Sequence, residues 1–122
     1  MKANELMIGD WVAFQGRPYQ YTAEDLATMA ECEKNGVPTD TSEIPLAKEI
    51  LEQNGFERNG TNFIIADDYY DVIIFELTDS IWTVAYHDCE MSFPDQRMHI
   101  AFVHELQHFL RACGIDKEII IK

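Results

Sequence analysis

Two short stretches near the start of the chain, residues 11–14 (WVAF) and 18–21 (PYQY), are rich in aromatic residues. Short runs of aromatic and β-branched residues that are bounded by turn-forming residues are typical of β-strands. The two stretches are joined by residues 15–17, a loop of hairpin length that contains a glycine. The pattern therefore predicts a β-hairpin.

A short helix is predicted to follow the hairpin, over residues 23–30. Thr22 and Asp25 have nearly the spacing and chemistry of a capping box, in which each side chain bonds to the backbone of the other residue. Residues 31–43 (ECEKNGVPTDTSE) are polar and rich in turn-forming residues, so we expect them to form a loop.

The second predicted helix covers residues 46–53, with Pro45 in its first turn and its apolar side chains on one side. Gly55 can adopt the left-handed conformation that ends a helix, and Phe56 can then fold back onto Leu51. This local sequence predicts a Schellman motif at the end of the helix, which is a structural feature without chemistry of its own.

Three strands joined by connections of hairpin length are predicted next, over residues 62–66, 72–77 and 81–87. In the third strand Trp82, Val84 and Tyr86 share one face, which we expect to be buried because large aromatic side chains dominate small cores. A short extended segment, a helix and a last strand are predicted to follow, at residues 98–100, 101–113 and 118–121.

These elements predict an α+β fold, a small antiparallel β-meander sheet with two or three covering helices. The chain has 122 residues, 47% of them apolar, which is the usual size of one domain and enough to build a core. We expect a single domain over 1–122, made of an N-terminal hairpin and short helix (6–30), a polar loop (31–43) and a helix–meander–helix unit (44–122).

The chain is strongly acidic, with 22 Asp and Glu against 9 Lys and Arg, a net charge of −13 and a sequence pI near 4.4. This charge disfavours direct binding to nucleic acid or to anionic membranes. It is typical of a well-solvated acidic surface, and an acidic DNA-mimic inhibitor of a nucleic-acid enzyme is the alternative.

Three cysteines, Cys32, Cys89 and Cys113, have no C-x-x-C spacing, which is typical of reduced thiols in a cytosolic protein. No apolar stretch has the length of a signal peptide or of a membrane span. We therefore expect a cytoplasmic protein that does not bind membranes.

The one motif that points to chemistry is the segment 104–108, HELQH, which matches H-E-x-x-H on a predicted helix. In zinc hydrolases with this pattern the two imidazoles bind the metal and the glutamate activates water. Here His104 and His108 would be zinc ligands and Glu105 the base of a small zinc-dependent hydrolase.

The residues around this motif do not complete a zinc site. Catalytic zinc takes three protein ligands. The metzincin positions of a glycine and a third histidine hold Arg111 and Gly114, and Glu118 is a poor substitute. His104 and His108 also lie opposite the apolar stripe of the helix, so we expect them to be solvated. The sequence therefore predicts no catalytic, cofactor-binding or metal-binding residue, with the zinc site as an alternative.

Two other metal patterns are weaker. His87 and Cys89 could join His104 and His108 in a structural zinc site, although the i, i+2 spacing of the first pair is not that of common zinc knuckles. The acidic turn at residues 67–71 resembles a calcium loop only in composition, because it lacks the central glycine and closing glutamate of an EF-hand. We expect that turn to be a solvated hairpin tip.

Three segments occur in order along nearly the whole chain: residues 1–6 with 8–12 (MKANEL, IGDWV), 44–46 leading to 54–56 (IPL, NGF), and 103–107 (VHELQ). Together they resemble a family of short uncharacterised proteins from gut anaerobes, often encoded in prophage-like or integrative elements. The closing helix of that family reads V-H-x-L-Q-N, so His104 and Gln107 match it, while Glu105 and His108 depart from it. The resemblance implies an accessory role in a mobile element and no known activity.

The sequence as a whole predicts a non-enzymatic accessory or interaction protein of a mobile genetic element, with a protein partner and no cofactor. The resemblance, the acidic charge and the incomplete catalytic set all favour this interpretation. The small zinc hydrolase and the acidic DNA mimic are the alternatives from other functional classes.

Overall fold

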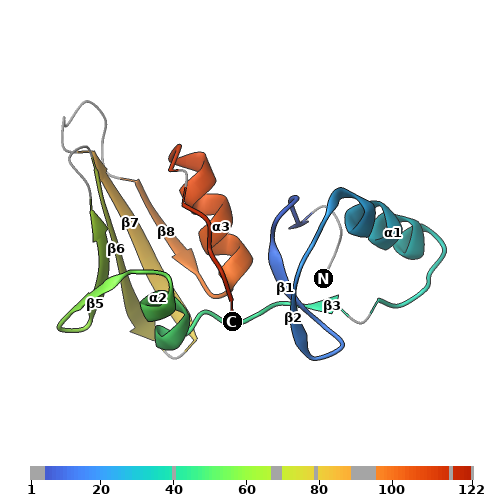
Figure 1. Cartoon of the computed structure of the whole chain (residues 1–122), viewed down its shortest axis with the longest axis horizontal. Coiled ribbons are helices and arrows are strands. Elements are labelled where there is room, and N and C mark those ends of the chain that lie inside the picture. Colours follow the sequence, from blue (N-terminus) through green and yellow to red (C-terminus); the bar gives the residue numbers. More distant parts are fainter. Residues whose placement is uncertain are drawn as a thin grey trace.

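The computed structural model describes residues 5–39, 41–66, 70–78, 80–88, 96–115 and 117–121. These residues form three helices and two antiparallel sheets, one of three strands and one of five (Figure 1). The predicted α+β class is confirmed. Within these ranges, none of the helices has the length and apolar character needed to cross a membrane.

The larger sheet is a meander in which each strand pairs antiparallel with the next one along the chain. The three strands predicted for it are confirmed, two of them with longer bounds. The extended segment predicted at residues 98–100 is part of a strand at one edge, and the strand at the other edge was not predicted. In order the strands are β4 (Glu57–Asn59), β5 (Asn62–Ala66), β6 (Tyr70–Thr78), β7 (Ile81–Asp88) and β8 (Gln96–Ile100).

Helix α3 (Val103–Ala112) covers one face of the five-stranded sheet (Figure 1). Its predicted apolar stripe is buried, including Leu106 and Leu110. Trp82 and Val84 on β7 are buried in the same core, as predicted, whereas Tyr86 is only partly buried. This interface is part of the larger of the two buried apolar clusters, in which each large buried side chain stabilises the fold by about 1.5–3 kcal/mol.

The predicted N-terminal hairpin is present as β1 (Trp11–Phe14) and β2 (Arg17–Gln20). A two-residue strand, β3 (Thr41–Ser42), pairs with β1 and completes a three-stranded sheet of order β2-β1-β3. Helix α1 (Ala23–Lys34) packs against this sheet over a second, smaller core. That core contains Leu6, Val12, Tyr21 and Met29.

Helix α1 begins at the predicted capping box: Thr22 Oγ1 accepts a hydrogen bond from the Asp25 N–H, and the Asp25 carboxylate accepts one from the Thr22 N–H. The predicted loop over 31–43 is wrong at both ends, because the helix continues to Lys34 and because β3 pairs with β1. Glu and Lys favour helix as well as solvent exposure. The helix ends where Gly36 adopts a φ of +69°.

Helix α2 (Lys48–Gln53) is shorter than the predicted helix over 46–53, and the prediction that Pro45 lies in its first turn is wrong. Pro45 instead forms an isolated antiparallel bridge with Phe102. The next N–H, that of Leu46, donates to the Ala101 carbonyl at 2.9 Å. The segment before α2 is therefore extended, since it pairs with the chain that enters α3.

The Schellman motif predicted at the end of α2 is confirmed. The Phe56 N–H donates to the Leu51 carbonyl at 3.1 Å, the Gly55 N–H donates to the Glu52 carbonyl at 3.2 Å, and Gly55 has a φ of +83°. Phe56 and Leu51 are both buried in the larger core. The local sequence was sufficient here because the motif closes within a few residues.

The strand predicted over residues 118–121 is not formed. The segment is held instead by the side chain of Asn54, whose Oδ1 accepts from the Ile120 N–H at 2.7 Å and whose Nδ2 donates to the Ile120 carbonyl at 2.9 Å. The Ile119 carbonyl also accepts from the Trp11 indole at 2.6 Å. Side chains thus replace the neighbouring strand that the prediction required.

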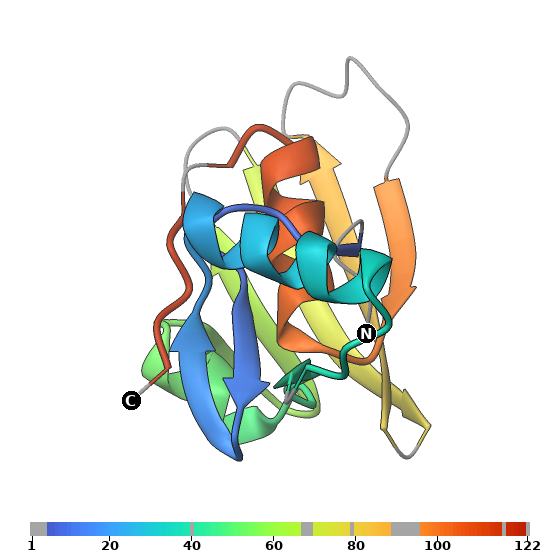
Figure 2. The same ribbon diagram turned by 90° about the vertical axis from the view of Figure 1, so that its right-hand side faces the viewer.

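Helix α3 lies between the two sheets, with the five-stranded sheet on one side and the N-terminal sheet on the other (Figures 1 and 2). Strand β1 is the part of the N-terminal sheet that contacts it. This arrangement places the polar face of α3, which carries the H-E-x-x-H motif, inside an interface.

Candidate functional site

The polar face of α3 is fixed to the backbone of the N-terminal segment by Gln107. The Gln107 Oε1 accepts from the Trp11 N–H at 2.8 Å, and its Nε2 donates to the Gly9 carbonyl at 2.9 Å. Gln107 is 5% exposed. The expectation that this face of the helix is solvated is therefore wrong.

Asp10 is the charged centre of the same interface, with an exposed fraction of 0%. One carboxylate oxygen lies 2.5 Å from Nε2 of His108, and the other accepts from Nη1 of Arg111 at 3.0 Å. The Met7 N–H donates to the carboxylate as well, at 2.8 Å. Asp10 thus joins the turn before β1 to two residues of α3.

His104, predicted to be solvated, is 7% exposed. Its ring stacks on Phe102 with centroids 6.0 Å apart, and it meets the ring of His108 edge-on at 5.5 Å. Its Nδ1 is buried and has no hydrogen-bond partner among the described residues. Burial lowers the pKa of His104, and the nearby His108 lowers it further, against the opposing effect of the carboxylates of Asp10, Glu105 and Glu43.

Glu105 serves as a helix cap. One oxygen of its carboxylate accepts from the backbone N–H groups of Ala101 and Phe102, at 3.0 and 3.1 Å. These two donors precede the helix and would otherwise lack partners. One oxygen of the carboxylate that a zinc hydrolase would use as its base is therefore bonded to the backbone.

The motif residues border a hollow of about 560 Å³, together with Glu5, Met7, Glu43, Met98 and Phe102. Among the residues that the structure describes, no group of three or more His, Cys, Asp or Glu side chains is arranged to hold a metal ion. The arrangement brings His104, Glu105 and His108 together, with His108 paired to Asp10 and Glu105 to the backbone.

Each of the two weaker metal patterns includes residues outside the described ranges. Cys89 and residues 67–69 of the acidic turn lie there, so neither the four-ligand zinc site nor the calcium loop can be placed. His87 lies on β7. The fourth histidine of the chain, His99 on β8, has its Nδ1 3.1 Å from Oγ1 of Thr83.

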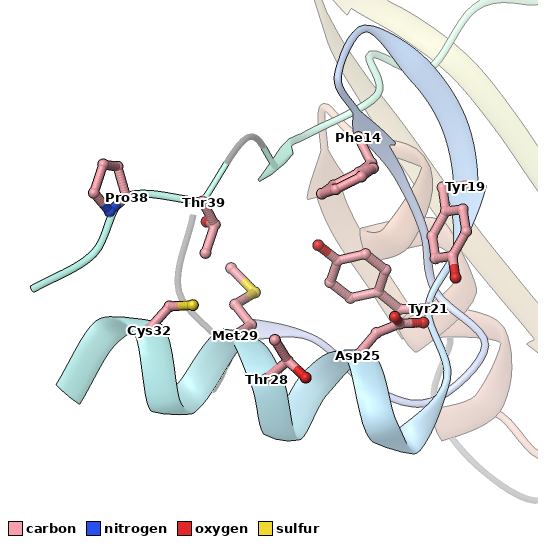
Figure 3. Close-up of a pocket in the computed structure, with 9 residues that line it drawn as sticks. All are labelled: Phe14, Tyr19, Tyr21, Asp25, Thr28, Met29, Cys32, Pro38 and Thr39. Atoms are coloured by element: carbon pink, nitrogen blue, oxygen red, sulfur yellow. The ribbon is translucent and has the colours of Figure 1, made fainter. Parts of the chain in front are cut away.

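A second hollow, which was not predicted, lies between the N-terminal hairpin and α1 (Figure 3). We call it the hairpin pocket; its volume is about 360 Å³. Figure 3 shows Tyr21 and Met29 pointing toward one another across it, with Asp25 at one end and Cys32 at the other. The lining residues are Phe14, Tyr19, Tyr21, Asp25, Thr28, Met29, Cys32, Pro38 and Thr39.

Aromatic rings form one side of the hairpin pocket. The Tyr19 ring lies 5.9 Å from that of Phe14 and 5.7 Å from that of Tyr21, centroid to centroid, with the second pair edge-on. Alternation along the hairpin explains part of this cluster, because residues 19 and 21 fall on the same side of an extended chain. Phe14 reaches them from the paired strand β1.

Among the described side chains that line the hairpin pocket, Asp25 is the one that carries a charge. Its Oδ2 accepts from both the N–H and the hydroxyl of Thr22 at 2.9 Å. The backbone hydrogen bond from Thr22 is the main cause that lowers the pKa of Asp25, so this carboxylate is ionised at neutral pH. Its hydrogen bond with the Tyr19 hydroxyl raises the pKa of Tyr19.

The rim of the pocket carries exposed aromatic surface. Phe14 is 39% exposed and Tyr19 is 42% exposed. The same two side chains also line a neighbouring hollow of about 430 Å³, together with Gln15, Arg17 and Pro18. Phe14 and Tyr19, which we call the aromatic ridge, therefore separate two adjacent hollows on the hairpin.

Comparisons with known proteins add no assignment, since no protein-family model, curated protein or solved structure matches this chain. Any function must therefore be argued from the aromatic ridge, the hairpin pocket and the interface on α3.

Proposed function

We propose that this chain is a non-enzymatic interaction protein that binds a segment of a partner protein at the aromatic ridge and the hairpin pocket. The observation that carries the proposal is the exposure of Phe14 and Tyr19 between two hollows. The cytoplasmic location and the accessory role in a mobile genetic element belong to the same proposal and rest on the sequence alone.

Exposed aromatic side chains beside a concave surface are typical of protein-binding sites. Tyr and Phe supply large, rigid contact area, and a few such residues carry most of the energy of an interface. Two hollows on either side of one ridge suit neighbouring side chains of an extended segment better than one compact small molecule. The ridge would insert between those side chains.

The contacts of the H-E-x-x-H motif support the non-enzymatic part of the proposal. Glu105 caps α3 and His108 pairs with the buried Asp10, while His104 is buried against Phe102. All three side chains thus have uses in the fold that require no metal. If zinc-loaded protein cleaved peptides, and Glu105→Gln abolished the cleavage in a folded variant, this part of the proposal would be wrong.

The binding part can be tested by selection of ligands from a library of random displayed peptides. The selected peptides should bind the Phe14→Ala, Tyr19→Ala double variant at least about tenfold more weakly, because the variant removes both anchors. The matched control is Leu77→Ala with Ile81→Ala, two exposed apolar residues of the meander. Peptides that bind both variants as tightly as the original protein would contradict the proposed site.

A further inference from the structure

We infer that the hairpin pocket receives a basic side chain of the partner segment, with its aliphatic stem between the aromatic and apolar walls and its cation beside Asp25. This inference rests on the proposed function and specifies its ligand. The pocket combines the two features that such a side chain needs, an apolar body and one ionised end.

The lining suits both the stem and the cation of a basic side chain. Phe14 and Tyr19 offer exposed aromatic surface at the pocket, and the buried side chains of Tyr21 and Met29 form its floor. Long basic side chains bury their methylene groups on apolar surface while the charged end stays polar. Cations are also attracted to the faces of aromatic rings, more often as a guanidinium than as an ammonium.

The ionised end of the pocket distinguishes a basic ligand from an apolar one. Asp25 is partly buried, and both of the hydrogen bonds that it accepts from Thr22 go to Oδ2. An apolar ligand would remove water from this carboxylate without replacing its hydrogen bonds, which costs free energy. A guanidinium would replace the water with charge-assisted hydrogen bonds.

The charge of the whole chain favours the same ligand. With a net charge of −13, the protein attracts basic segments from solution and repels acidic ones. Arginine therefore fits the pocket better than lysine or any neutral side chain, because its planar cation both stacks on rings and pairs with carboxylates.

The test is an NMR titration with two capped amino acids, N-acetyl-arginine methylamide and its neutral isostere N-acetyl-citrulline methylamide. The methyl group of Met29, labelled with carbon-13, reports on the pocket, and those of Met7 and Met98 report on surfaces elsewhere. We expect the arginine probe to shift the Met29 signal with a dissociation constant about tenfold lower than that of the citrulline probe.

Two variants separate charge from shape. Asp25→Asn should remove the preference for arginine over citrulline, while Glu24→Gln, the loss of a neighbouring exposed carboxylate in the same helical turn, should retain it. Because Asp25 also caps α1, Tyr19→Leu serves as a second variant that keeps the cap. It should weaken arginine binding more than citrulline binding.

Equal binding of the two probes, or no shift of Met29 up to the solubility limit of the probes, would overturn this inference. Those results would leave the proposed function to be decided by the peptide selection. Conversely, peptides insensitive to Phe14 and Tyr19 would contradict the proposed function, even where the isolated arginine probe binds.

Discussion

At the scale of single residues, the candidate catalytic and metal-binding side chains make contacts that stabilise the fold. Asp10, which no sequence motif marks, is the most constrained of their partners, since its buried carboxylate pairs with His108 and Arg111. The positive charge of Arg111, on the same helix as the two histidines, is offset by Asp10. No local pattern predicts this pairing, because the partners are about a hundred positions apart in the chain.

Asp10→Asn tests the energetic weight of this contact. The substitution keeps the shape of the side chain but leaves the Arg111 guanidinium without a counterion, so we expect the free energy of unfolding to fall by about 2 kcal/mol. Partial exposure of Arg111 and His108 keeps the loss below that of a fully buried pair. Urea unfolding measures it, with the exposed-site variant Glu24→Gln as control, and equal stability of Asp10→Asn and the original protein would contradict the account.

His104 should make the fold sensitive to acid. Burial lowers its pKa, so the folded protein binds this proton less readily than the unfolded chain, whose value lies near 6.5. The contribution of neutral His104 to stability is therefore complete above the unfolded pKa of 6.5 and declines as the pH falls below it. His104→Phe removes both the titration and the partnerless Nδ1, so stability should be equal or higher at neutral pH.

The measurement is urea unfolding at several pH values from about 7 to about 5, below the unfolded pKa of histidine. The original protein should lose more stability over this range than His104→Phe does. The neighbouring groups Asp10, His108, Glu105 and Glu43 are present in both proteins, so the difference isolates His104. Parallel stability curves would show that His104 contributes nothing to the acid response.

At the scale of elements, periodicity predicted the apolar face of α3 but not the use of its polar face. A helical pattern distinguishes apolar from polar positions, and it cannot tell a polar side chain in water from one that bonds to a neighbouring backbone. Gln107 is the clearest case. Strands β3 and β4 were missed for a different reason. They have two and three residues, too few for a periodic pattern, and they depend on their partner strands for pairing.

Gln107→Leu should weaken the contact between α3 and the N-terminal sheet. Leucine has a similar volume but offers no acceptor to the Trp11 N–H, so we expect a loss of about 2 kcal/mol. Hydrogen exchange of the Trp11 amide should become faster at the same time. Gln53→Leu, an exposed change at the end of α2, is the control; unchanged exchange at Trp11 in Gln107→Leu would contradict the role given to the amide.

At the scale of the whole molecule, the predicted strands with their hairpin-length connections were enough to predict the α+β class and the meander, but not the order of the layers. Residues 8–12 and 103–107 meet at the junction of the layers, where the Gly9 carbonyl and the Trp11 N–H bond to the side chain of Gln107. The hairpin pocket was missed for a similar reason, because it needs Met29 from α1 beside the rings of the hairpin. Its only sequence signal was the pair of tyrosines at alternate positions.

The net charge of −13 predicts opposite effects of salt on folding and on binding. Carboxylates outnumber basic groups 22 to 9, so self-repulsion acts across the surface, while the Asp10–Arg111 pair is shielded from solvent at its carboxylate. Moderate sodium chloride, which shortens the screening length to about 8 Å at 0.15 M, should therefore stabilise the fold and weaken binding of the arginine probe. Thermal unfolding and the Met29 titration, each at low and moderate salt, measure the two effects, with the citrulline probe as a neutral control. A fold that loses stability as salt is added would show that attractive pairs outweigh the repulsion.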